Sequence, residues 1–592
     1  MNPSKKRFNS FRVVIPVEFD SVFSGLKRED PVEVLKMLSR ESIVKLASLL
    51  KREYCGEPAL KMVALLSNTD SHFMPLYKHL SEHTIRTKQT KGADVVVAFD
   101  ITPLELLRIA FSIEPDEMRD VSPMQADQLQ WRLTKVIAQI NQRLMDYTTT
   151  SAPSNSVAKL LLVNDASYKD IHKIESKGQF IIQPIQAIRF FQLLESKPKY
   201  EGLLNAFYEM YGITSWKEYV KTIYSLSLQC FKEGIGIYTA RMIEENAMFL
   251  NKSVLEKISI DANNEVIPYA CSDEYDDKGN SDYKEFKGRP LFKLRNGDYV
   301  VHNQAILLDR LFQGLYFDFL HLAKNLEKKH PDVAGLFTSD FIEKTLFASV
   351  VKDCLRSCKC FAYDEEDLMG VHRLSQSELG YPDFFVRSKS NKLAILFECK
   401  DIRMNAWVKE QRDYELLERE LKNKIVRKKY KQDRLNKRHE ELAKPRKIGV
   451  GQLAGHTTNI RKGQFPWATD LPPDVVVYPV LVIADNRLIY DGLPLLAQQW
   501  YYECLESEGL TISAQDRPLI MMSPLTFIKY KRRFKAHGFA YYFEKYYEAI
   551  SVKPESMVDL FNKVMSFDTF MEQYAYSLQG LRKDLMKMVY ER

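Results

Sequence analysis

The chain has 592 residues, of which 45% are hydrophobic and 28% are charged, and its formal net charge is +7. This length predicts several domains, and the composition is that of an ordinary globular protein, which excludes a fibrous or a disordered class. No apolar run approaches the ~18 residues that a membrane span needs. Pro16, Glu18 and Asp20 interrupt the apolar stretch that follows the basic start, so it makes a poor signal peptide and we expect a cytoplasmic protein.

The eight cysteines are scattered along the chain, and one of them, Cys399, lies in the strand described below. Cys354, Cys358 and Cys360 form the only cluster. Their spacing contains no CxxC pair and no histidine accompanies them, so we predict reduced thiols rather than a zinc site.

Residues from about 30 to 260 are predicted to be helical. Apolar residues recur at intervals of three and four behind Asp and Ser caps, as in Pro31–Leu38 and Ser42–Leu50. We therefore expect residues 1–270 to form an all-α N-terminal region with a loop at Ser151–Ser156. No motif in this region indicates a chemistry, and we expect it to sense a signal or to bind a protein partner.

A connector is predicted at residues 271–335. Its polar loop, Ser272–Gly288, is rich in acids that lack the spacing of a calcium loop. Pro290–Val301 predicts a hairpin with Asn296-Gly297 at its turn, and Ala305–Leu326 predicts an apolar helix.

Helices and strands alternate from Phe337 onward. We predict a helix at Phe337–Leu355 with Thr338 or Ser339 as its cap, a strand at Cys358–Tyr363, a helix at Ile448–Arg461 and a buried strand at Val475–Ala484. Residues 404–444 contain no Gly or Pro, which predicts one helix of about 60 Å or a helical hairpin. After residue 490 we expect an α/β to helical extension: helix Leu493–Leu505, strand Pro518–Met522, a helix opened by Ser523-Pro524, and further helix from 553 to 592.

Between these elements, the stretch Tyr381–Ile402 consists of two short apolar runs that flank the polar residues Ser388–Asn391. This pattern predicts a β-hairpin. Side chains alternate along a strand, so Glu398 and Lys400 share one face of the second strand with apolar residues. Burying such charges is unfavourable unless they are paired or bind a metal, and Asp383 begins the neighbouring strand, where it can reach the same place.

Pro382-Asp383, a spacer and Glu398-Cys399-Lys400 resemble the signature of the PD-(D/E)XK nuclease superfamily. The predicted order of helix, three strands, helix and strand is similar to the αβββαβ core of that superfamily. The fold class is therefore expected to be α/β, with a restriction-endonuclease-like core at residues 336–490, a charged helical insertion at 404–447 and an extension at 491–592.

The resemblance implies a site for Mg²⁺, for which Mn²⁺ is a plausible substitute. Asp383, Glu398 and the backbone carbonyl of Cys399 would hold the ion, and Lys400 would orient a water or stabilise developing charge. Many members of the superfamily add an acid from the first helix. Glu343 is the candidate here, with Asp340 and Glu378 as competitors, and the alternative is that Glu343 is simply a first-turn acid favoured by the helix dipole.

Two residues of the following helix are further candidates. The resemblance implies that Gln452 lies near the water or the scissile phosphate, and His456, one turn later, lies on the same side. Either residue can equally be a cap or a helix-packing residue.

Two basic segments predict contacts with nucleic acid. Lys409–Lys447 holds 15 basic and 8 acidic residues, and we expect Arg427, Lys428, Lys429 and Lys431 to contact phosphates. The alternative is a partner-binding or dimerisation helix that uses Tyr414, Leu417, Leu421 and Ile425. Lys529, Arg532 and Arg533 interleave with Phe527, Tyr530, Phe534 and Tyr541, which is typical either of a single-strand-binding surface or of an amphipathic helix with an aromatic core face.

Together these features predict a metal-dependent endonuclease that hydrolyses the phosphodiester bonds of DNA, in bacterial antiviral defence or restriction. The competing function is that of a catalytically silent nucleic-acid-binding or scaffold subunit of a defence or transposition complex. The expected partners are DNA, an activating protein at the N-terminal region and possible further copies of the chain, with no membrane.

Overall fold

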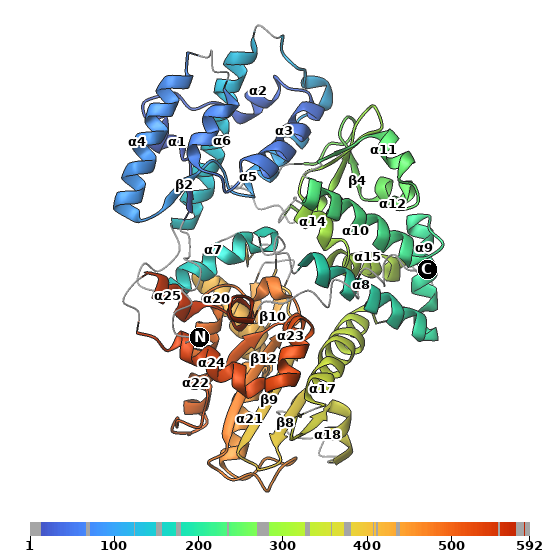
Figure 1. Ribbon diagram of the computed structural model, residues 1–592, viewed down its shortest axis with the longest axis vertical. Helices are drawn as coiled ribbons and strands as arrows, with labels where there is room; N and C mark the ends of the chain where they lie inside the picture. The colour runs from blue at the N-terminus through green and yellow to red at the C-terminus, as the bar shows by residue number, and fades with distance from the viewer. Residues whose placement is uncertain are drawn as a thin grey trace. The chain divides into compact units, whose positions relative to one another are not determined.

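The chain folds as two compact units. The first unit comprises residues 1–10, 151–170 and 332–583, and the second comprises residues 11–150, 171–331 and 584–592 (Figure 1). The computed structural model describes residues 14–66, 71–122, 125–149, 157–172, 179–233, 236–268, 283–325, 332–356, 358–371, 380–405, 408–409, 413–433, 438–553, 557–575 and 585.

The second unit is mainly helical, but it also contains two sheets. Strands β1 (Val14–Pro16) and β2 (Asp94–Val96) form a parallel pair, and a four-stranded sheet has the order β3-β6-β5-β4. The expectation of an all-α N-terminal region is therefore wrong. These strands are two or three residues long, too short for the alternation of polar and apolar residues by which a strand is recognised. The strands of the four-stranded sheet are β3 (Ile237–Tyr238), β4 (Ser259–Asp261), β5 (Leu291–Lys293) and β6 (Tyr299–Val301).

Of the two elements predicted at Pro290–Leu326, the hairpin is present and the helix is divided. The hairpin predicted at Pro290–Val301 is confirmed as β5 and β6, with Gly297 N–H bonded to the Leu294 carbonyl in its turn. The single helix predicted at Ala305–Leu326 is instead two helices separated by a short turn at Arg310, whose guanidinium is buried against Asp318. The helices of ten or more residues are α3 (Arg40–Glu53), α4 (Phe73–Lys91), α5 (Thr102–Phe111), α6 (Ala126–Thr149), α8 (Gln179–Ser196), α9 (Glu201–Tyr211), α10 (Trp216–Glu233) and α15 (Gln313–Asn325); shorter helices are α1 (Phe19–Val22), α2 (Pro31–Leu35), α11 (Ala240–Glu245), α12 (Lys252–Lys257), α13 (Lys284–Gly288) and α14 (Gln304–Asp309).

The first unit is built on a five-stranded mixed sheet with the order β13-β12-β9-β8-β7. Each strand predicted for the nuclease-like segment is present. Strands β7, β8 and β9 pair antiparallel, and β9, β12 and β13 pair parallel, so β9 is central and buried on both edges. The strands are β7 (Cys360–Asp364), β8 (Phe384–Ser388), β9 (Leu393–Lys400), β12 (Val476–Ile483) and β13 (Ile520–Met522).

The two faces of this sheet are covered by different helices. Ala394 and Leu396 of β9 belong to a core cluster with residues of α7 (Val157–His172), α20 (Tyr414–Ile425), α21 (Val450–Arg461) and α22 (Leu493–Ser507). On the other face, the Phe397 ring packs 5.7 Å from the Phe347 ring and 6.0 Å from that of Phe527. A fully buried ring of this kind is worth ~3–5 kcal/mol against alanine.

The helix that carries Glu343 begins as α16 (Val333–Gly335), continues as a π-helix, η8 (Leu336–Ala348), and ends as α17 (Ser349–Leu355). Its range agrees with the prediction, but the predicted cap is wrong. The side chain of Asp332, not that of Thr338 or Ser339, caps the preceding turn by accepting from Gly335 N–H.

The insertion is not the helix or helical hairpin that we predicted. Helix α20 ends at Ile425, and β10 (Arg427–Asp433) and β11 (Arg438–Lys447) form an antiparallel hairpin. In a helix, the run of cations after Ile425 would place like charges three and four residues apart, which is unfavourable. In the hairpin, Lys431 lies opposite Glu440 and Asp433 opposite Arg438, whereas Arg427 and Lys428 lie opposite the basic residues Lys447 and Arg446.

In the described residues between 490 and 575, the C-terminal extension is helical apart from β13, as predicted, and most of the helix predicted beyond residue 575 lies outside the described residues. Ser523 caps α23 (Pro524–His537) by accepting from Leu525 N–H, and α24 (Phe539–Ile550), α25 (Met557–Val564) and α26 (Phe567–Ala575) follow. The predicted loop at Ser151–Ser156 and most of the predicted polar loop lie outside the described residues. Within the described ranges, no helix combines the length and the apolar character needed to cross a membrane.

Candidate active site

Lys400 brings the two predicted metal-binding carboxylates together at the end of the central strand. Its Nζ lies 2.6 Å from Glu398 Oε2 and 3.2 Å from Asp383 Oδ2. Because one ammonium contacts both carboxylates, Asp383 and Glu398 face the same small space. The three residues that carry the resemblance therefore converge, although they come from two strands.

The register of the sheet explains how Asp383 reaches this place. Strand β8 begins at Phe384, opposite Phe397, and continued pairing would place Asp383 opposite Glu398 and Pro382 opposite Cys399. Instead of a backbone partner from Pro382, the Asp383 side chain serves this position, and its Oδ2 accepts from Cys399 N–H at 2.6 Å. The N–H and C=O of one strand residue point to the same edge, so the Cys399 carbonyl lies on the Asp383 side, as a ligand there would require.

Glu398 is fully buried and lies between two basic groups. Its Oε2 contacts Lys400, and its Oε1 lies 3.7 Å from Nε2 of His456. Among the described residues, Oε1 has no hydrogen-bond partner. A buried carboxylate oxygen without a partner is unfavourable, so one more positively charged or donor group near Oε1 would stabilise Glu398.

The charges at the site are unbalanced. Burial, together with the charge of Glu398, raises the pKa of Asp383 to about 8, although Lys400 lowers it. Burial also raises the pKa of Glu343, against the effect of the nearby Lys400. Burial opposes the charge of Lys400, but Glu398 and Asp383 raise its pKa above the usual value, so Lys400 is charged. Three acids thus share one ammonium.

The donor set fits a hard divalent cation. Mg²⁺ prefers oxygen ligands and usually binds one or two protein carboxylates together with several waters. Asp383, Glu398 and the Cys399 carbonyl supply such a set, with Lys400 now in the position between the carboxylates. In the part of the chain that the structure describes, no ready-made group of three or more His, Cys, Asp or Glu side chains is arranged around a metal position. Any ion held here would therefore depend on two carboxylates, the carbonyl and water.

Of the acids proposed for the first helix, Glu343 acts on this site. Its charge contributes to the raised pKa of Asp383, and the charge of Lys400 in turn lowers the pKa of Glu343. Asp340 lies one turn earlier, where its backbone carbonyl accepts from the Thr345 hydroxyl. Glu378 lies outside the described residues.

Gln452 and His456 of α21 have different surroundings. Gln452 Oε1 accepts from Gly449 N–H at 2.9 Å, so its side chain caps the start of the helix, as the alternative interpretation had it. Gly449 has a φ of +47°, and a Cβ there would lie 2.7 Å from the Ile425 carbonyl oxygen. His456 is buried beside Glu398. Sequence reasoning named His456 only as a neighbour of Gln452, and its i+4 spacing from Gln452 was the one signal that could have pointed to the sheet.

The segment after β9 is hydrogen-bonded to two helices, η8 and α20. Asp401 accepts from the Thr338 hydroxyl of η8 at 3.1 Å. Asn405 donates to Glu420 of α20 at 2.5 Å, and Lys424 Nζ donates to the Arg403 carbonyl. These contacts attach α20, and with it the start of the β10–β11 hairpin, to the end of β9 that carries Lys400.

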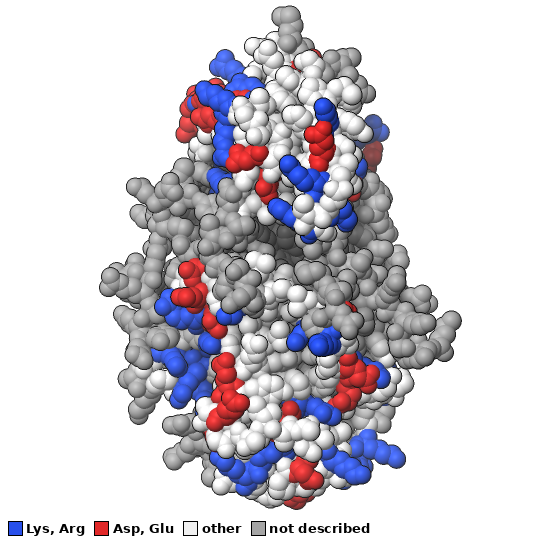
Figure 2. Space-filling model, turned by 90° about the vertical axis from the view of Figure 1, so that its left-hand side faces the viewer, with Lys and Arg blue, Asp and Glu red and all other residues white. Residues whose placement is uncertain are grey.

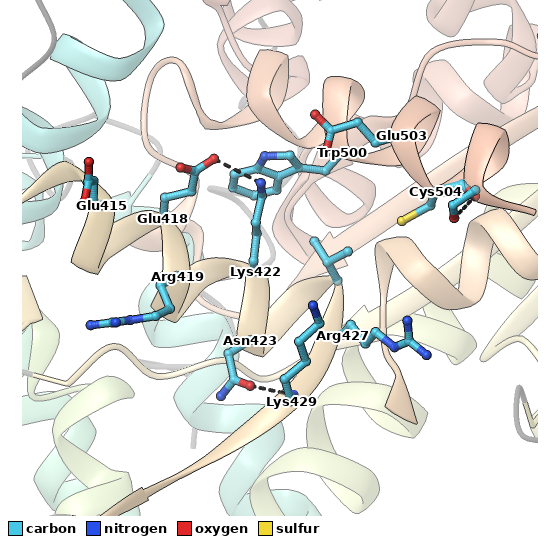
Figure 3. A pocket seen from close by; sticks show the side chains of 12 residues that line it. Glu415, Glu418, Arg419, Lys422, Asn423, Arg427, Lys429, Trp500, Glu503 and Cys504 are labelled. Atoms are coloured by element: carbon cyan, nitrogen blue, oxygen red, sulfur yellow. Dashed lines mark hydrogen bonds and ion pairs between the residues drawn. The ribbon is translucent and has the colours of Figure 1, made fainter. Parts of the chain in front are cut away.

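The predicted phosphate-binding cations at the hairpin are partly available. Arg427 and Lys429 are exposed, Lys428 is half-buried, and the side chain of Lys431 lies outside those described. Arg427 and Lys429 lie together at one end of a pocket of about 440 Å³, and Lys422 reaches the Trp500 indole at the other (Figure 3). The alternative dimerisation face is not available, because Tyr414, Leu417, Leu421 and Ile425 are all buried in the core of the first unit.

The second basic segment corresponds to the amphipathic alternative. Phe527, Tyr530 and Phe534 are buried, so they cannot stack on bases, and Lys529 is nearly buried and pairs with Glu572 at 2.9 Å. Arg532 and Arg533 remain exposed. The aromatic residues of α23 form its core face.

Comparisons with protein-family models, with curated proteins and with solved structures found no match.

Proposed function

We propose that this chain is a metal-dependent endonuclease that acts on DNA, with its active site at the end of β9. The observation that carries the proposal is a charge imbalance: Lys400 is the one ammonium of the described residues that interacts with all three acids, Asp383, Glu398 and Glu343. Buried charges of one sign are unfavourable without compensation, and a divalent cation supplies what is missing.

Asp383, Glu398 and the Cys399 carbonyl would hold the cation, which when bound polarises the phosphate and lowers the pKa of an attacking water. Asp383 must give up its proton to act as a ligand, since its pKa lies at about 8. If Asp383 and Glu398 held a cation, the Lys400 ammonium that now contacts both carboxylates would be free to approach a phosphate oxygen or the water. The water would lose a proton to solvent and attack phosphorus, the bond from phosphorus to the leaving oxygen would break, and the leaving oxygen would take up a proton from solvent.

The β10–β11 hairpin would hold the substrate. Arg427 and Lys429 are exposed, and neither forms an ion pair with another described residue. Cations of this kind contact phosphates without reading sequence. On the face drawn in Figure 2, Lys and Arg side chains of the described residues are interspersed with Asp and Glu. Arg427 and Lys429 would therefore make a local contact with the DNA backbone.

The test is cleavage of plasmid DNA with Mg²⁺, compared with EDTA, Lys400→Ala and Lys392→Ala. Lys392 is an exposed lysine at the other end of β9, so it is a matched control for loss of a positive charge. We expect cleavage by the wild type and by Lys392→Ala, and none with EDTA or by Lys400→Ala. Cleavage that persists at the wild-type rate in Lys400→Ala would overturn the assignment. DNA binding by all proteins without any cleavage would instead favour the scaffold function.

A further inference from the structure

The buried face of α21 carries a histidine that the proposed reaction does not yet use. His456 and Glu398 are both almost completely buried, and His456 Nε2 lies 3.7 Å from Glu398 Oε1. The imidazole packs against two aromatic rings in edge-to-face geometry, and its centroid lies 6.0 Å from that of Phe465 and 6.1 Å from that of Trp467. The ring therefore has little freedom to turn away from Glu398.

In the described part of the chain, two buried polar groups that face each other lack hydrogen-bond partners here. Neither ring nitrogen has a hydrogen-bond partner among the described residues, and Glu398 Oε1 also has none. Buried polar groups are nearly always satisfied, so two unsatisfied groups that face each other point to an interaction that forms in another state of the site. The gap exceeds a normal N–H···O distance by less than about 1 Å, which a small change in the Glu398 side chain would close.

The two carboxylate oxygens of Glu398 contact different residues. Lys400 contacts Oε2 at 2.6 Å, on the side where Asp383 and the proposed cation position lie. His456 faces Oε1 on the other side, from the helix. A donor on Oε1 would therefore fix the carboxylate plane and leave Oε2 directed at the cation.

We propose that His456 is a positioning residue that donates from Nε2–H to Glu398 Oε1 when Glu398 turns from Lys400 to a bound cation. This inference rests on the proposed function, because it assigns His456 a role toward the metal that Glu398 would hold. A hydrogen bond of this kind sets the orientation and the basicity of a metal-binding carboxylate. The competing interpretation is that His456 only packs against Phe465 and Trp467.

The experiment measures Mn²⁺ binding to the full chain without DNA, by the loss of the free-ion electron paramagnetic resonance signal. His456→Leu removes both nitrogens at similar volume, and His456→Gln keeps a side-chain N–H donor. Thr457→Val is the matched control: Thr457 is buried on the same helix, but its hydroxyl accepts from Tyr501 at 2.9 Å instead of facing the site. Melting temperatures of all proteins, with EDTA present, report effects on folding alone.

We expect His456→Leu to weaken Mn²⁺ binding by about 10- to 100-fold, the usual effect of removing a group that orients a metal ligand. His456→Gln should restore most of that affinity, and Thr457→Val should bind as the wild type even if it melts earlier. Wild-type affinity in His456→Leu, or an equal loss in His456→Gln and His456→Leu, would overturn the positioning role while leaving the nuclease proposal intact. A wild type that binds no Mn²⁺ would refute the metal site itself and this inference with it.

Discussion

Substitution of Asp383 by asparagine should make the protein more stable at high pH. In the folded chain the pKa of Asp383 is raised to about 8 from an ordinary value of 3.8. A raised pKa means that the folded form keeps a proton that the unfolded form has already lost. The stabilising contribution of this proton is therefore complete below pH 4 and is lost as the pH rises through about 8. The amide side chain of the Asp383→Asn variant would remain neutral and able to form hydrogen bonds at every pH.

The size of the effect follows from the shift. One pKa unit corresponds to about 1.4 kcal/mol, so the full shift sets an upper limit of ~6 kcal/mol. The Asp383 side chain is 21% exposed and shares Lys400 with Glu398, so water and the neighbouring charges reduce that limit. We expect the variant to gain about 2–3 kcal/mol over the wild type between pH 5 and pH 8. For a unit of this size, that is a relative rise in melting temperature of about 4–12 °C.

The assay is thermal unfolding in EDTA at pH 5, 6, 7 and 8, followed by intrinsic fluorescence. Only the difference between variant and wild type at each pH is interpreted, because a chain with two units need not unfold in one step. Asp470→Asn is the control, since its pairing with Asn391 and Arg387 lowers the pKa of Asp470 and should give no change above pH 5. If the difference between Asp383→Asn and wild type is the same at pH 5 and pH 8, Asp383 is not a buried, high-pKa acid, and the charge argument for the site is wrong.

Two further predictions concern the hairpin and the helix after it. Replacing Arg427 and Lys429 by glutamate should weaken DNA binding and reduce the slope of log affinity against log salt concentration by about 2. The same replacement of Lys389 and Lys392 should leave the slope unchanged. An unchanged slope for the Arg427 and Lys429 variant in filter-binding titrations would exclude the hairpin as a phosphate contact. Gly449→Ala should lower the free energy of unfolding in urea titrations by about 1–3 kcal/mol. The positive φ of residue 449 is unfavourable for alanine, and the new Cβ would lie 2.7 Å from the Ile425 carbonyl oxygen. An unchanged free energy of unfolding would contradict that geometry.

The parts of the fold that were predictable are those with a strong local pattern. The alternation along Leu393–Lys400 and the apolar run Val476–Ile483 identified β9 and β12, and the polar residues Ser388–Asn391 identified the turn between β8 and β9. The convergence of Asp383 with Glu398 and Lys400 followed from that hairpin alone. Each of these inferences depends on residues close together in the chain, where side-chain periodicity is informative.

The errors arose where local pattern was weak or misleading. The absence of Gly and Pro in residues 404–444 permits a helix but does not require one, and the segment after Ile425 pairs instead as the β10–β11 hairpin. The very short strands of the second unit left no periodicity to detect. The contact between His456 and Glu398 joins residues 58 positions apart, and only the packing of α21 on the sheet brings them together. Gln452 was ambiguous from the start, because a glutamine near a helix start is as suitable for a cap as for a catalytic site.

The charge balance at Lys400 connects stability with the proposed activity. A buried ion pair adds little to stability, and replacing one with apolar residues is often neutral or favourable, so this cluster is poorly explained as a structural feature. With one ammonium for Asp383, Glu398 and the nearby Glu343, the folded protein must keep a proton or accept a cation. Cation binding should therefore release the Asp383 proton and should stabilise the fold more at pH 6.5 and above than at pH 5. The same imbalance that weakens the cation-free protein at alkaline pH is thus the source of its expected affinity for a divalent ion.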